Sequence, residues 1–187
     1  MSGNLFAEFP YLESDELVLR KMEPGDADDL FKIYANGKLF RYTPGSPRKT
    51  RDAVQNMIGH FERDFGKRKT LMLGICLRSE PGRVVGVAEM FDYDPKVNGV
   101  TIGYRLNEAF WGCGIATKAV KLMTGYLLDA IGVNRIQAFV MPENTKSHAV
   151  LARNGFTKEG TVRQGYFWTG RGVVDLTVYS LLRSDPR

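Results

Sequence analysis

The chain has 187 residues, of which 43% are hydrophobic and 25% charged, with two cysteines and a formal net charge of +5. These values are typical of a globular protein with one core. They exclude a disulfide framework, and Cys76 and Cys113 lack zinc-ligand spacing. No apolar run reaches the roughly 18 residues of a membrane span, and the N-terminus has no apolar signal core. We therefore expect one cytoplasmic domain over residues 1–187, without a metal.

The first predicted elements are a strand and two helices. Alternating hydrophobic residues predict a strand over Glu16–Met22. Pro24 and the aspartates after it predict the start of a short helix, which Gly37 ends. From Arg51, apolar residues at helical spacing predict an amphipathic helix. These residues are Val54, Met57, Ile58, Phe61 and Phe65.

An antiparallel meander and a long helix follow. Thr70–Leu77, Val84–Phe91 and Val100–Leu106 predict three strands, because turn compositions separate them. Beyond residue 115 an apolar stripe predicts a helix, and Gly132 is a suitable residue to end it.

The last part of the chain returns to the sheet. Arg135–Met141 predicts a strand parallel to Val100–Leu106, because a helix connects the two. A brief helix from about Thr145 ends at Gly155. Phe156–Val162 and Val173–Leu182 predict a closing antiparallel pair.

Residues 110–120 read FWGCGIATKAV and place two glycines before the long helix. A helix N-terminus offers unpaired N–H groups and partial positive charge, so this loop suits an anion. An NTPase phosphate loop would require GK[ST] where the chain reads GIATK, and a dinucleotide loop would require a third glycine. A plain tight turn is the remaining alternative.

The surrounding sequence resembles the GNAT superfamily of N-acetyltransferases, in its RimJ/RimL-like branch. Two segments carry the resemblance, IGYRLNEAFWGCGIATKAV and VMPENTKSHAVLARNGF, and the opening LVLRKMEPGDADDL is also similar. The resemblance implies an α+β fold, with a mixed, mostly antiparallel sheet of about six or seven strands and about four helices. Strands 4 and 5 of that sheet are expected to splay apart.

The resemblance also implies the residues that hold acetyl-CoA, the acyl donor. Backbone groups of Arg105 and Leu106 would pair with the pantetheine arm, Asn144 would bond to it, and Ser147 would meet the sulfur. Helix capping is the alternative for Asn144 and Ser147. The loop expected to bind the pyrophosphate consists of Trp111, Gly112, Cys113, Gly114, Ile115 and Ala116.

Amide formation requires a neutral amine to attack the thioester, so a general base would help. Many members of the family place an acid at the position that Thr101 occupies here. Glu89 on the preceding strand is the replacement that we expect, although an outward-facing residue is an equal alternative. Tyr104 is a further catalytic candidate, with aromatic packing as its alternative. His148 is expected on a solvated helix face, with a place in the lining of the site as its alternative.

Three functions are compatible with these patterns. The first is acetyl transfer to a primary amine, either a protein N-terminal α-amine such as that of a ribosomal protein, or a small-molecule amine. The second is a non-catalytic acyl-CoA-binding sensor. The third, an RNA-associated basic protein, has little aromatic support, so we do not expect nucleic acid as a partner. Residues 37–50 and 163–172 are the expected acceptor loops, and a homodimer through the last strands stays open.

Overall fold

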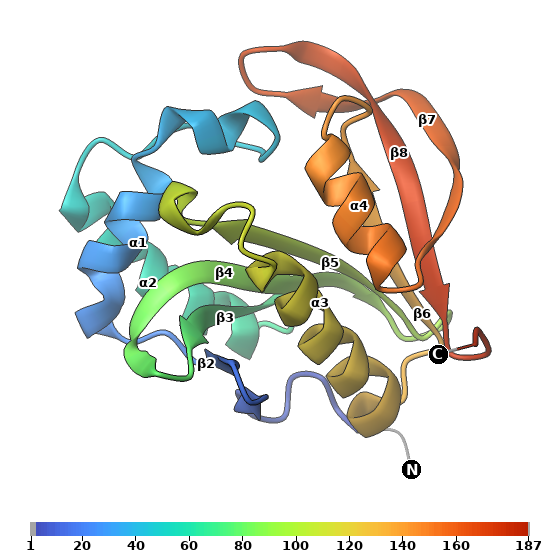
Figure 1. The fold of residues 1–187 in the computed structure, drawn as a ribbon, viewed down its shortest axis with the longest axis horizontal. Helices are drawn as coiled ribbons and strands as arrows, with labels where there is room; N and C mark the ends of the chain where they lie inside the picture. The colour runs from blue at the N-terminus through green and yellow to red at the C-terminus, as the bar shows by residue number, and fades with distance from the viewer. Residues whose placement is uncertain (1–2, 187) are drawn as a thin grey trace.

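The computed structural model describes residues 3–186, which form one eight-stranded sheet with helices on both faces (Figure 1). The spatial order is β1-β2-β3-β4-β5-β6-β8-β7, and only the β5–β6 pair is parallel. The strands are β1 (Leu12–Glu13), β2 (Leu17–Arg20), β3 (Thr70–Leu77), β4 (Glu80–Asp94), β5 (Gly99–Leu106), β6 (Arg135–Val140), β7 (Thr157–Trp168) and β8 (Gly172–Leu182). The mixed, mostly antiparallel sheet is confirmed, with one or two strands more than expected.

Four α-helices cover the sheet in two pairs. They are α1 (Ala27–Tyr34), α2 (Arg51–Gly66), α3 (Ile115–Gly125) and α4 (Thr145–Arg153). Shorter helical turns are η1 (Pro24–Asp26), η2 (Gly37–Arg41) and η3 (Glu108–Phe110), and a π-helical segment, η4 (Tyr126–Ile131), continues α3. Gly132 ends that segment at φ 77°, which glycine adopts without steric cost.

The alternation of side chains along β4 separates two hydrophobic cores. Val87 packs with Leu30 of α1 and Val54 of α2, whereas Ala88 and Met90 belong to the core that includes α3. Successive residues of a strand point to opposite faces of its sheet. The middle strands are therefore buried on both sides, and each of their residues faces either the α1–α2 layer or the α3–α4 layer.

The hairpin between β3 and β4 is tighter than its composition indicates. The sequence SEPGR predicts a turn, but β4 already begins at Glu80, which pairs with Leu77. Only Arg78 and Ser79 form the turn. The prediction was wrong here because the backbone of Pro81 and Gly82 is compatible with a strand that is exposed at its start.

The parallel pairing of β5 with β6 is confirmed, and it is short. Its register contains Gly99 with Arg135, Val100 with Ile136, and Thr101 with Gln137, after which both strands continue separately. At the last pair, Gln137 Nε2 donates to Thr101 Oγ1 at 3.0 Å. We call the diverging segments, 102–106 of β5 and 138–140 of β6, the splay. The expected parting of these two strands is therefore present.

No helix within residues 3–186 is long and apolar enough to cross a membrane.

Candidate active site

The register of β5 decides which of its backbone groups face the splay. Asn107 N–H donates to Val85 O at 2.9 Å, and the β4–β5 register continues from that pair without a shift through Arg105. Hydrogen-bonded pairs alternate along an antiparallel ladder, so the Arg105 backbone faces β4. The expectation that Arg105 offers its backbone to pantetheine is therefore corrected. Tyr104 and Leu106 face the splay instead.

Trp111 occupies part of this backbone edge. Its indole Nε1–H donates to Leu106 O at 2.9 Å, and its own backbone N–H donates to Glu108 O at 3.1 Å. Leu106 therefore still directs its N–H at the splay, whereas its carbonyl oxygen is occupied by Trp111. Trp111 supplies no free N–H to the loop, contrary to expectation, and instead anchors the loop to the end of β5.

The glycine loop combines left-handed backbone with a helix start. Gly112 and Gly114 have φ +80° and +77°, and a Cβ on either would meet nothing within 4 Å. Lys118 N–H closes the first turn of α3 onto Gly114 O, so Ile115 and Ala116 have N–H groups without partners in the helix. The positive φ angles alone account for the glycines. The case for an anion site therefore rests on the N–H groups.

The start of α4 places a serine hydroxyl beside the splay. Asn144 is the N-cap: its Oδ1 accepts from Ser147 N–H at 3.3 Å, and its Nδ2 donates to Ser147 Oγ at 3.1 Å. The capping alternative for Asn144 is confirmed. Because Ser147 Oγ accepts from the amide, its own hydrogen is available to donate to a ligand.

Tyr104 lies close to this serine on the α3–α4 side of the sheet. Its hydroxyl is buried and makes no hydrogen bond with any group of residues 3–186. Burial raises the pKa of Tyr104 to about 12, and the nearby Ser147 hydroxyl opposes part of this rise. A buried hydroxyl without a partner is uncommon. Tyr104 therefore stays protonated at neutral pH and can donate a hydrogen bond into the splay.

A second cluster lies on the α1–α2 side of the same strands. Arg105 Nη2 lies 2.5 Å from Glu89 Oε1, and Arg105 Nη1 donates to Tyr34 Oη at 3.2 Å. Both ion-pair side chains are largely buried, at 12% and 19% exposure. Burial disfavours the charge on Arg105, but Tyr34 and Glu89 outweigh this, and its pKa lies above the ordinary value. Glu89 is therefore held beside a permanent cation.

Gly103 makes room for the Glu89 carboxylate. The two residues are register partners on β5 and β4, and a Cβ on Gly103 would lie 2.3 Å from Glu89 Oε1. The carboxylate thus lies across β5, toward the side where β6 departs. The outward-facing alternative for Glu89 is wrong, since the side chain is paired and mostly buried.

The predicted catalytic residues lie on the two faces of the sheet. Tyr104 faces α4 and its Ser147, while Glu89 lies with Arg105 on the side of α1. The splay is the place where the two sides communicate, because β6 no longer pairs with β5 beyond Thr101. A thioester held in the splay would have the hydroxyls on one side and the carboxylate on the other.

Two features of this region were not predicted from the sequence. The Tyr34 and Arg105 side chains complete the Glu89 cluster, and only the register between β4 and β5 could have indicated that Arg105 and Glu89 share a face. His148 is not solvated as expected: its Nδ1 lies 2.8 Å from Tyr179 Oη and its Nε2 lies 3.2 Å from Pro142 O. It ties α4 to β8.

A hollow lies elsewhere, away from these residues. It has a volume of about 600 Å³ and lies between α2 and the segment after β2, with Lys21, Gln55 and His60 in its wall. None of the predicted site residues lines it, so the splay and not this hollow is the candidate site.

Strands that part beside a glycine-rich helix start, with unpaired backbone groups along one edge, define a class of protein that transfers acyl groups from coenzyme A. The chain belongs to the GNAT acetyltransferase family, whose domain model matches residues 16–157. It is therefore an acetyl-CoA-dependent N-acetyltransferase, as the RimJ/RimL-like resemblance implied, and acetyl-CoA is the acyl donor.

Similar proteins cover nearly the whole chain. The N-acetyltransferase p20 of Bacillus licheniformis is 32% identical over 93% of this chain and 97% of its own. The ribosomal protein uS5 alanine N-acetyltransferase of Escherichia coli is 26% identical over 80% of this chain and 79% of its own. The solved structure of the microcin C7 self-immunity acetyltransferase MccE, in complex with acetyl-CoA and AMP, has a TM-score of 0.79 at 25% identity, covering 90% and 93% of the two chains.

Proposed function

We propose that the protein transfers the acetyl group of acetyl-CoA to a primary amine in the splay, with Glu89 as the general base. The acceptor is the α-amine of a protein N-terminus, such as that of a ribosomal protein, or the amine of a small molecule. The observation that carries this proposal is the unpaired edge of β5 at Tyr104 and Leu106, flanked by Ser147 on one side and Glu89 on the other.

The donor would lie along this edge. The diphosphate suits the N–H groups of Gly112, Cys113, Gly114, Ile115 and Ala116, where the helix dipole adds partial positive charge. The pantetheine amides would pair with Tyr104 and with Leu106 N–H, in the way an added strand does. This brings the thioester to the point where β6 departs.

The chemistry then needs no covalent enzyme intermediate. The amine nitrogen attacks the thioester carbon, and its proton passes to Glu89 directly or through water. As the C–S bond breaks, Ser147 Oγ–H donates a hydrogen bond to the leaving thiolate and keeps its own proton. The thiolate takes up the proton from Glu89 through water, so that free CoA thiol leaves and Glu89 is a carboxylate again. Tyr104, with a pKa near 12, keeps its proton and stabilises developing charge by hydrogen bonding only.

The acceptor side favours amines that lose a proton readily. At neutral pH an amine with pKa near 10.4 requires roughly 4–5 kcal/mol for deprotonation, whereas an α-amine near 8 requires about 1. The ribosomal protein acetyltransferase among the relatives supports an α-amine. We further propose one domain over the whole chain. A homodimer through the last strands, of which β7 lies at an edge of the sheet, and a cytoplasmic location stay predictions.

Release of free thiol from acetyl-CoA, measured with a panel of primary amines, tests the proposal. We expect turnover with at least one amine, and a large loss of turnover in Ser147→Ala and in Glu89→Gln with acetyl-CoA binding retained. Binding of acetyl-CoA without release of thiol for any amine would favour the sensor. Thr101 is the observation on which that alternative rests, because a threonine hydroxyl is too weak a base for this role; here it accepts a hydrogen bond from Gln137 Nε2.

A further inference from the structure

Two segments meet at the end of the sheet where β5 and β6 have parted. Figure 1 shows η2 and the turn between β7 and β8 at the same end of the molecule. Contacts join them: Trp168 Nε1 donates to Phe40 O at 3.4 Å, and Arg171 Nη1 donates to Arg41 O at 3.4 Å. The half-buried Tyr42 packs against the cluster that Met141, Trp168 and Leu176 form. The two segments therefore form one continuous wall.

This wall is basic and contains no acid of its own. Residues 37–50 contain Lys38, Arg41, Arg48 and Lys49, and residues 163–172 contain two further arginines, while neither segment has an aspartate or glutamate. Lys38 is neutralised by Glu108, 2.5 Å away. Among residues 3–186, no carboxylate forms a salt bridge with Arg41 or Arg48.

Three arginines of this wall approach the splay from its two sides; we call Arg41, Arg48 and Arg171 the arginine rim. On the β5 side, Arg48 N–H donates to Tyr34 O at 2.8 Å, and the Tyr34 hydroxyl belongs to the Glu89 cluster. Burial raises the pKa of Tyr34, and Arg48 is one of the cations that oppose this rise. The positive charge of Arg48 therefore acts on the Tyr34 hydroxyl of the Glu89 cluster.

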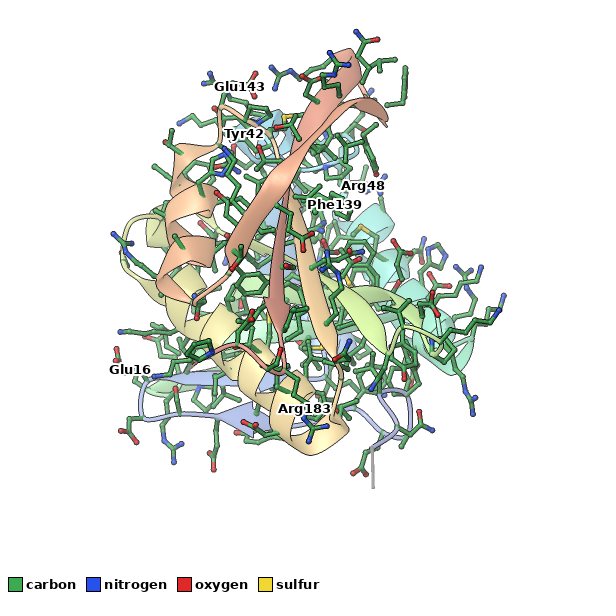
Figure 2. The ribbon with its side chains drawn as sticks, turned by 90° about the vertical axis from the view of Figure 1, so that its right-hand side faces the viewer. Glu16, Tyr42, Arg48, Phe139, Glu143 and Arg183 are labelled. Carbon is green, nitrogen blue, oxygen red and sulfur yellow. The ribbon has the colours of Figure 1, made fainter. Side chains whose placement is uncertain are left out.

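On the β6 side, the rim reaches the residues that lead into α4. Arg171 contacts Met141 Sδ at 3.0 Å and Glu143 Oε1 at 3.1 Å. The backbone N–H of Glu143, followed by Arg171 and Arg41, holds the pKa of this carboxyl below its usual value. Figure 2 shows Tyr42 and Glu143 at the same end of the molecule, opposite Glu16 and Arg183. Two cations of the rim, Arg171 and Arg41, thus act on one carboxylate.

We propose that the acceptor carries an anionic group, a carboxylate or a phosphate, a few atoms from its reacting amine, and that the arginine rim binds this group. The inference rests on the proposed function and specifies its substrate class. Guanidinium groups bind both anions through paired N–H donors. Tyr42 supplies an aromatic surface beside Arg41, whose guanidinium carbon lies 5.2 Å from the centre of its ring. A polyamine is disfavoured, because its second ammonium group would lie beside the rim cations.

Thiol release with matched amines tests the inference. O-phosphoethanolamine is compared with ethanolamine, glycine with glycinamide, and spermidine serves as the polyamine. We expect the anionic member of at least one pair to have a kcat/KM about tenfold or more above its neutral partner; which pair responds separates phosphate from carboxylate. Arg41→Gln and Arg48→Gln are each expected to lower this preference, the ratio of the two kcat/KM values within a pair, about fivefold.

The control is Lys96→Gln, which removes one positive charge at the turn between β4 and β5, away from the rim; it should leave the preference unchanged. Faster reaction of the neutral amines or of spermidine would overturn the inference while acetyl transfer itself stands.

If no amine reacts, calorimetry with O-phosphoethanolamine and ethanolamine on the CoA-saturated protein tests the inference instead. Equal binding, or tighter binding that persists in the Arg41→Gln/Arg48→Gln double variant, overturns the inference. If the unaltered protein does not bind acetyl-CoA, that result instead contradicts the proposed function.

Discussion

Gly103 shapes the site because it has no side chain. A Cβ there would lie 2.3 Å from Glu89 Oε1 and 2.8 Å from its Cγ. Gly103→Ala is therefore expected to push the carboxylate away from Arg105 and lower kcat by roughly 10- to 100-fold, up to the lower end of the contribution of general-base catalysis. Steady-state kinetics with saturating acetyl-CoA measure this.

Gly99→Ala is the matched control on the same strand, because a Cβ there would make only ordinary contacts of 3.5 Å or more. It should preserve kcat. An unchanged kcat in Gly103→Ala would show that the position of Glu89 has no part in the reaction.

Removal of the Tyr104 hydroxyl is expected to affect stability and catalysis in opposite ways. Because it has no hydrogen-bond partner among the described residues, Tyr104→Phe removes an unsatisfied group, and burial of such a group costs about 1–3 kcal/mol. We expect the free energy of unfolding to stay level or rise, while kcat falls about tenfold. Chemical denaturation and thiol release measure the two effects. A variant that loses stability but keeps kcat would assign Tyr104 to packing alone.

At the scale of elements, the loop before α3 depends on two left-handed residues. Asparagine tolerates the left-handed region better than β-branched residues do, so two substitutions at Gly112 separate strain from ligand access. Gly112→Val should destabilise the fold by about 1–2 kcal/mol. Gly112→Asn should destabilise it less, and both should weaken acetyl-CoA binding about tenfold because a side chain projects into the diphosphate path. Calorimetry that finds full affinity in Gly112→Asn would place the diphosphate elsewhere.

Elements were predictable from the sequence where local patterns determine them. The helix α2 and strand β3 begin where periodicity and composition place them, and Gly132 and Gly155 end helical segments at positive φ. The parallel β5–β6 pairing followed from the connecting helix. The tight β3–β4 turn and the two-residue β1 were missed, because two residues are too few to show a hydrophobic periodicity.

The site was predictable only in part, for a physical reason. Motif resemblance identified Ser147 and the glycine loop, and an acid within an apolar strand pointed to Glu89. Which backbone groups of β5 are unpaired depends on the register with β4, a long-range property that placed Tyr104 rather than Arg105 at the edge. The Tyr34–Arg105 contact joins residues 71 positions apart, and no local pattern encodes it.

At the scale of the whole molecule, one ion pair ties the outer strand to the sheet interior. Arg135 of β6 contacts Glu159 of β7 at 2.8 and 2.5 Å, and Ser180 of β8 donates to the same carboxylate at 2.7 Å. The Arg135 bonds, followed by that of Ser180, lower the pKa of Glu159 to about 2 from 4.5. A depressed carboxyl pKa stabilises the folded state above the unfolded value, and this contribution is lost as pH falls toward the folded value.

The free energy of unfolding of the unaltered protein should therefore exceed that of Glu159→Gln at neutral pH, by less than about 1 kcal/mol because solvent screens the half-exposed pair. The difference should shrink between pH 4.5 and about 2. Denaturant titrations at several pH values measure it. A difference that is constant across this window would show that the ion pair does not anchor β7.

Residue-resolved amide hydrogen exchange with and without acetyl-CoA tests the central claim most directly. The account predicts that the ligand slows exchange at Tyr104 and Leu106, whose N–H groups face the splay, and at residues 112–116 of the glycine loop. Gly103 and Arg105, already paired with β4, should change little. Protection at the hollow beside α2, with Tyr104, Leu106 and the glycine loop unaffected, would contradict it.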